Sequence, residues 1–223
     1  MRRKPRLWHG LPARAWTASL LLLSAAQISP TVYKNDFEQA QVGKVPDDIL
    51  VLDGTFAVRQ VDANKCLELA GDPLGSFAAL FGPDGMIGAD VSARIQGFPQ
   101  GKRFPEFGIG AGGPGGYKLF AVPGQHRIEL RKGEDVKAFA SFDWSPGSWT
   151  CFRLRIEPGD KNTWAIKAKA WRQGTTEPEA WMVNAEDPKP PSGKASIWGS
   201  DYSEQPIRFD DLSVVSPSPA GRG

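Results

Sequence analysis

The stretch IGADVSARI, residues 87–95, indicates the fold class. Every second residue in it is apolar: Ile87, Ala89, Val91, Ala93 and Ile95. The polar residues between them are Asp90, Ser92 and Arg94. Successive side chains of a β-strand point to opposite faces of its sheet, so this alternation predicts a strand with one face in the core and the other in solvent.

The same period of two recurs along the chain, for example in HRIELR (126–131), WTCFRLRIE (149–157) and TWAIKAKAW (163–171). Turn signals separate these segments, because 25 Gly and 19 Pro are spread over 223 residues. About a dozen antiparallel strands in one chain of this length must stack into two sheets or close into a barrel. We therefore predict an all-β fold, a two-sheet antiparallel β-sandwich, over residues 27–216.

The N-terminal residues 1–26 have the pattern of a signal peptide. Basic residues precede the apolar run ASLLLLSAA (18–26), which ends with the small residues Ser24 and Ala26 at the positions that signal peptidase reads. The run is too short to span a bilayer, so we expect no membrane span after cleavage; an uncleaved anchor is the alternative. This predicts a secreted or periplasmic protein. The Pro- and Gly-rich residues 217–223 are expected to form a disordered tail.

Charge and histidine content exclude several classes of function. A formal net charge of +2 argues against a nucleic-acid partner. His126 is the single histidine outside residues 1–26, so a metal site with several histidines is excluded within the predicted mature chain.

Glycosidases usually need two carboxylates, and the E-x-D-x-x-E pattern that places them on one strand is absent. Asp90 and Glu129 are then the candidate catalytic residues, with Glu106 as a further carboxylate that could converge with them from another strand.

The two cysteines, Cys66 and Cys151, leave two alternatives open. In an oxidising compartment they could form a disulfide. They could equally remain free thiols, because sequence gives no distance between them.

Polar residues on the outward faces of the strands are the candidate ligand-binding residues. If these strands are neighbours in one sheet, their side chains form a polar strip, to which Trp171 adds an aromatic face for a sugar ring. The excess of arginine favours an acidic oligosaccharide. The strip comprises Arg94, Arg127, Glu129, Arg153, Arg155, Lys167 and Trp171.

Three stretches resemble secreted concanavalin A-like lectin/glucanase domains: NDFEQAQVGKVPDD (35–48), WSPGSWTCFRLRIE (144–157) and GKASIWGSDYSEQPIRFDDLSVV (193–215). Within that superfamily the sequence looks most similar to laminin-G-like and bacterial 3-keto-disaccharide-hydrolase-type domains. The resemblance implies a jelly roll whose concave face often binds glycans. It also implies a structural calcium ion, because acids near both ends of related modules hold one; here these would be Asp36, Glu38 and Asp210.

Three hypotheses about function follow from these observations. The first is a secreted, lectin-like domain that binds an oligo- or polysaccharide without catalysis. The second is a glycoside hydrolase or polysaccharide lyase of the same fold. The third is a structural interaction domain at the cell surface.

Overall fold

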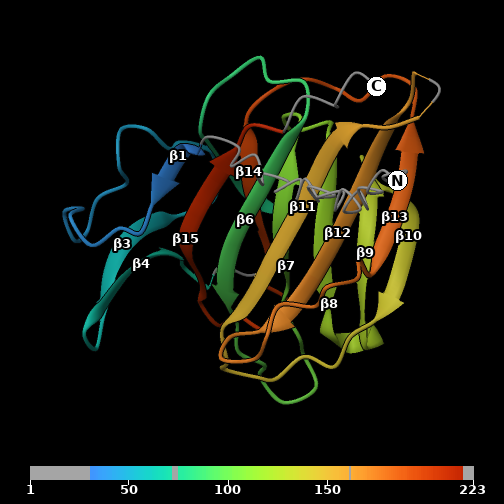
Figure 1. Cartoon of the computed structure of the whole chain (residues 1–223). Coiled ribbons are helices and arrows are strands. Elements are labelled where there is room, and N and C mark those ends of the chain that lie inside the picture. Colours follow the sequence, from blue (N-terminus) through green and yellow to red (C-terminus); the bar gives the residue numbers. More distant parts are fainter. Residues whose placement is uncertain (1–30, 72–74, 161, 218–223) are drawn as a thin grey trace, which may run out of the picture.

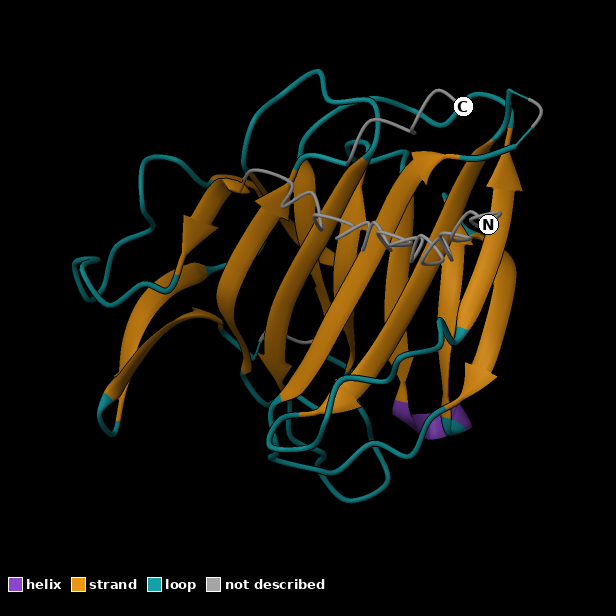
Figure 2. Cartoon of the chain, viewed as in Figure 1, coloured by secondary structure: helices purple, strands orange, loops and turns teal. Residues whose placement is uncertain are grey.

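The computed structural model describes residues 31–71, 75–160 and 162–217. Strands dominate them, and the one helix in this part of the chain is a short 3-10 turn, η1 (Pro123–Gln125) (Figure 2). The predicted signal peptide, residues 1–26, lies outside the described residues, and so does all of the predicted tail except Pro217. No helix in the described part is long and apolar enough to cross a membrane.

Two antiparallel sheets stack face to face, as predicted (Figure 1). The eight-stranded sheet has the order β13 (Val183–Asp187), β12 (Trp164–Arg172), β11 (Thr150–Pro158), β6 (Ala89–Gln96), β15 (Ile207–Val215), β4 (Asn64–Leu69), β3 (Phe56–Val61). Its eighth strand, β1 (Thr31–Asn35), lies outside this order and pairs with β15. The seven-stranded sheet has the order β10 (Asp135–Ser141), β9 (Arg127–Lys132), β8 (Tyr117–Val122), β7 (Glu106–Ala111), β14 (Ala195–Ser200), β5 (Phe77–Phe81), β2 (Leu50–Asp53).

The core lies between the sheets and contains the apolar side chains that alternation assigns to the inner faces. Val91 and Ile95 of β6, Phe152 of β11 and Ile166 of β12 are fully buried. Across the interface, Phe152 meets Phe107 of β7 edge to face, with ring centroids 5.9 Å apart. Such aromatic contacts stabilise the packing of one sheet on the other beyond the burial of apolar area.

Two details of the strand prediction are wrong. Ile87 is 56% exposed instead of in the core, because Gly88, with a φ of +82°, ends a turn and β6 begins only at Ala89. The short strands β2 and β13, each at the edge of its sheet, were not predicted. Their sequences, LVLD and VNAED, are too short to show a clear period of two.

Candidate functional site

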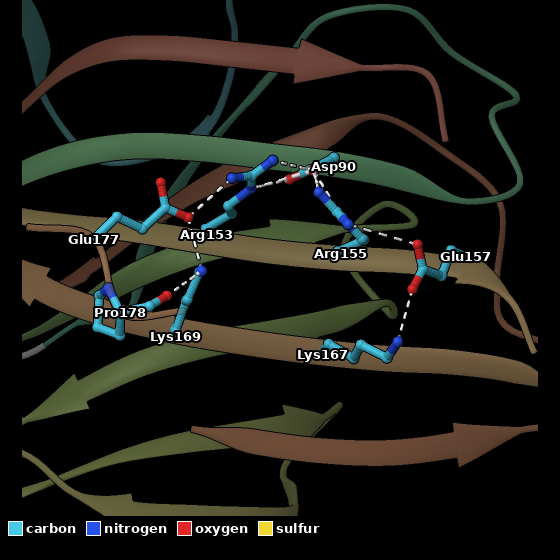
Figure 3. Close-up of polar contacts among 8 residues, drawn as sticks. All are labelled: Asp90, Arg153, Arg155, Glu157, Lys167, Lys169, Glu177 and Pro178. Carbon is cyan, nitrogen blue, oxygen red and sulfur yellow. Dashed lines mark hydrogen bonds and ion pairs between the residues drawn. The ribbon is translucent and has the colours of Figure 1, made fainter. Parts of the chain in front are cut away.

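A network of charged side chains lies on the outer face of the eight-stranded sheet, over β6, β11 and β12 (Figure 3). Asp90 of β6 is at its centre: it is 6% exposed and accepts hydrogen bonds from Nε of Arg153 at 2.9 Å and Nε of Arg155 at 2.8 Å. Arg155 pairs directly with Asp90 in the β6/β11 register, and Arg153 is two residues along the same face. The bonds to Asp90 raise the pKa of Arg153. This charged network comprises Asp90, Arg153, Arg155, Glu157, Lys167, Lys169 and Glu177.

The loop after β12 folds back over the charged network. Glu177 in this loop accepts hydrogen bonds from Nη1 of Arg153 at 2.9 Å and pairs with Nζ of Lys169 at 2.8 Å. Burial raises the pKa of Glu177, but the bonds from the two cations outweigh it and lower the pKa overall. Trp181 lies against the same cations, with Nζ of Lys169 4.7 Å from its ring centroid. These contacts fix residues 173–182, here called the strap, on the sheet.

A pocket of about 240 Å³ lies beside the charged network and is here called the Trp171 pocket. Its lining includes four residues singled out from the sequence: Asp90, Arg94, Arg153 and Trp171. Arg155 and Lys167, also predicted to bind ligand, lie on the same face outside the lining, paired with Asp90 and Glu157. Sequence reasoning missed Glu177 and Trp181, because nothing local to the strap shows that it returns to the sheet. It also left out Lys169, which lies on β12 two residues after Lys167.

The predicted polar strip is wrong in two of its members. Arg127 and Glu129 lie on β9, which belongs to the seven-stranded sheet, whereas the other members lie on the eight-stranded sheet. Alternation shows whether a side chain faces the core, but it does not show which sheet a strand joins. Asp90 and Glu129 therefore lie on the outer faces of opposite sheets, with the core between them, and cannot act as a catalytic pair on one bond.

A second network occupies the outer face of the seven-stranded sheet. Glu129 is only 1% exposed and accepts hydrogen bonds from Nε of Arg127 at 2.7 Å and Nε of Arg131 at 2.6 Å. Arg131 also donates to Glu106 of β7 at 3.1 Å. Beside this network, Nζ of Lys118 lies 3.8 Å from the ring centroid of Trp198. Burial lowers the pKa of Lys118. Glu106 and Glu129 thus share one arginine. Glu106 had been named from the sequence as a carboxylate that could converge with Glu129 from another strand.

Glu106 connects this second network to a pocket of about 470 Å³ at the end of β7, here called the Tyr202 pocket. Two aromatic residues, Phe104 and Tyr202, line it, and Tyr202 is 45% exposed. The polar lining includes Arg103, Gln125 and the buried Asp201. One carboxylate oxygen of Asp201, Oδ1, accepts hydrogen bonds from the Ser203 hydroxyl at 3.1 Å and the Gln205 backbone N–H at 3.0 Å, which fix the position of the side chain.

The calcium site expected from the family resemblance is not assembled. β1 ends at Asn35, so Asp36 and Glu38 lie in the following turn, where Glu38 accepts a hydrogen bond from the backbone N–H of Lys65 at 2.9 Å. Asp210 is fully buried and pairs with Nη2 of Arg94 at 2.6 Å, so a guanidinium balances its charge. Among the residues that the structure describes, no three His, Cys, Asp or Glu side chains are placed to hold a metal.

Cys66 and Cys151 are free thiols, so the disulfide alternative is wrong for this structure. Both lie on the eight-stranded sheet, but Cys151 is on β11 and Cys66 on β4, with β6 and β15 between them. Three strand spacings of ~4.8 Å separate the strands by about 14 Å. A disulfide requires Cα atoms within about 7 Å of each other, so the bridge cannot form without breaking the sheet.

We expect the two thiols to differ sharply in reactivity. Cys151 is half-buried and lines the Trp171 pocket, whereas Cys66 is fully buried and burial raises its pKa to about 11. Iodoacetamide at pH 8 should therefore modify one thiol per chain, Cys151, and more slowly than a free cysteine, because burial also raises the pKa of Cys151. Peptide mass spectrometry would identify the site. Rapid modification of Cys66 in the native protein would contradict this packing.

No protein-family model matches the chain, and no curated protein matches it either. Several solved structures share its fold. The carbohydrate recognition domain of Emp46p superposes with a TM-score of 0.56 at 10% identity, covering 85% of this chain and 99% of that domain. A Bacillus subtilis protein of unknown function with a galectin-like fold gives 0.50 at 11% identity, covering 83% of this chain and 96% of that one.

A third similar structure is GH43B of the Bacteroides ovatus xyloglucan locus, with a TM-score of 0.54 at 15% identity over 86% of this chain. The match covers only 40% of that longer protein. At these identities the structures show a shared fold, a two-sheet jelly-roll β-sandwich, and this agrees with the fold that the resemblance in the sequence implies. The finer likeness to laminin-G-like or 3-keto-disaccharide-hydrolase-type domains stays a prediction.

Proposed function

We propose that this chain is an extracytoplasmic carbohydrate-binding domain whose glycan occupies the Tyr202 pocket. One observation carries the proposal: two partly exposed rings, Phe104 and Tyr202, line the same pocket as the fixed carboxylate Glu106. Aromatic faces pack against the C–H faces of sugar rings, while carboxylates and amides hydrogen-bond the hydroxyls. A volume of about 470 Å³ is within the range of pockets that hold small ligands.

The comparisons and the N-terminal sequence support the proposal from separate directions. Structures with this fold include a carbohydrate recognition domain and a glycoside hydrolase family member. The basic and apolar residues before Gln27 favour export from the cytoplasm. An exported protein can reach extracellular glycans.

Substitution of Tyr202 with alanine is expected to weaken glycan binding. A glycan array would first identify a ligand, and isothermal titration calorimetry would then compare affinities. Loss of one stacking ring should cost about 1 kcal/mol, which is roughly fivefold in affinity. Leu50→Ala is the matched control, because Leu50 is also exposed but lies on β2 outside the pocket. Equal affinities of a folded Tyr202→Ala variant and the parent protein would overturn the placement of the glycan.

A hydrolase is the second candidate, favoured by the presence of Glu106 and Asp201 in one pocket. Hydrolysis of a glycosidic bond needs two carboxyl groups that flank it, one as acid and the other as base or nucleophile. Release of reducing ends from a bound polysaccharide, lost in Glu106→Gln, would establish this activity. Binding without release of reducing ends would support the lectin-like function. If the protein neither bound nor cleaved any glycan, a structural interaction domain would be favoured.

A further inference from the structure

We propose that the Trp171 pocket is a second ligand site, which takes an uncharged, polyhydroxylated ligand such as a neutral sugar residue. It lies on the outer face of the eight-stranded sheet, whereas the Tyr202 pocket belongs to the seven-stranded sheet. The inference therefore goes beyond the proposed function and does not depend on it.

The ion pairs within the pocket indicate a neutral ligand. Asp90 is shared by Arg153 and Arg155, and Glu177 is shared by Arg153 and Lys169. Asp211 pairs with Nε of Arg94 at 2.9 Å. A charged ligand would have to displace one of these partners, and this argues against the acidic oligosaccharide expected from the sequence.

Uncharged hydroxyl groups can use this lining without breaking its ion pairs. An ionised carboxylate offers about four lone-pair positions, so Asp211, with a half-exposed side chain, can accept a hydrogen bond from a ligand while it stays paired. Ser92 and Gln173 add neutral groups that both donate and accept. A sugar hydroxyl likewise donates and accepts, so it matches this mixed set of partners.

Trp171 and the size of the pocket fit a single sugar ring. Trp171 is partly exposed, which leaves ring surface for the C–H face of a sugar. The volume of the pocket is about 240 Å³. That space suits one sugar ring.

The site is organised before any ligand arrives. Asp90 is held by two arginines, and Glu177 is held on the sheet by the strap contacts with Arg153, Lys169 and Trp181. Binding then requires little ordering of side chains, which reduces the entropic cost of association.

Cys151 provides a direct test, because its thiol lines this pocket and not the Tyr202 pocket. Iodoacetamide modification of Cys151 would be timed by mass spectrometry with millimolar glucose, galactose, mannose or N-acetylglucosamine, and with glucuronate or glucosamine as charged counterparts. At least one neutral sugar should slow modification several-fold, while the charged counterparts should not. No slowing by any neutral sugar, or stronger protection by a charged one, would overturn the proposal.

Variants separate this site from the proposed glycan site. Trp171→Ala should raise the sugar concentration needed for protection about tenfold, and Ser92→Ala should raise it less while keeping the ring in place. Tyr202→Ala should leave the protection of Cys151 unchanged. Loss of protection in Tyr202→Ala, or full protection in both Trp171→Ala and Ser92→Ala, would show that the sugar does not act through the Trp171 pocket. Circular dichroism would confirm that each variant is folded.

Discussion

Replacement of Gly108 with alanine should destabilise the protein by about 3 kcal/mol or more. Gly108 is on β7 in the middle of the seven-stranded sheet, paired with Phe120 on one side and Trp198 on the other. A Cβ atom on Gly108 would lie 1.9 Å from the backbone oxygen of Leu119. No side-chain rotation relieves a contact with backbone, so β7 and β8 would have to move apart.

Urea unfolding followed by tryptophan fluorescence would measure this loss. Gly115→Ala is the matched control, because Gly115 lies in the turn of the same β7/β8 hairpin and an added Cβ there would meet nothing within 4 Å. The control should unfold within about 0.5 kcal/mol of the parent protein. If Gly108→Ala were equally stable, β7 and β8 would have to be packed differently from the structure described above.

Alternation in the sequence predicts most of the strands and most of the core, because the period of two reports directly which side chains face inward; the short strands β2 and β13 were missed. In β6, for example, Val91, Ala93 and Ile95 were assigned to the inner face and are buried. The same signal could not place β9, because the order of strands in a sheet depends on long-range pairing. Arg127 and Glu129 were therefore assigned to the wrong sheet.

The two pockets show a second limit of the sequence. Trp171 was singled out as a binding residue because it shares a strand face with lysines, and in the structure it lines a pocket. Tyr202 and Asp201 lie in a loop without period, and their proximity to Glu106 depends on the neighbouring positions of β7 and β14. The ion partner of Asp210 was missed for the same reason, since Arg94 is 116 residues away in the chain.

Asp90→Ala should lower the free energy of unfolding by about 2–3 kcal/mol. Removal of the carboxylate leaves Arg153 and Arg155 side by side without the counterion they share. Loss of one partner from a buried ion pair typically costs about 3–5 kcal/mol, but both arginine side chains are 30% exposed, so solvent screens part of the repulsion. Denaturant unfolding of the variant would measure the loss.

A double-mutant cycle identifies the cause of that loss. If repulsion between the arginines dominates, Arg155→Ala in the Asp90→Ala background should recover part of the lost stability. Asp135→Ala is the control for an exposed pair, because Asp135 and Lys137 both face solvent, and it should change stability by less than about 0.5 kcal/mol. Equal effects of Asp90→Ala and Asp135→Ala would mean that Asp90 does not organise the charged network.

Asp90→Ala also connects stability to the second ligand site. Without Asp90, Arg153 keeps its ion pair with Glu177 and its contact with the Trp181 ring, and its side chain is less fixed at the edge of the Trp171 pocket. Sugar protection of Cys151 should therefore weaken in this variant even at temperatures where it stays folded. An unchanged protection curve would indicate that the ligand contacts depend on Trp171, Ser92 and Gln173, and not on the orientation of Arg153.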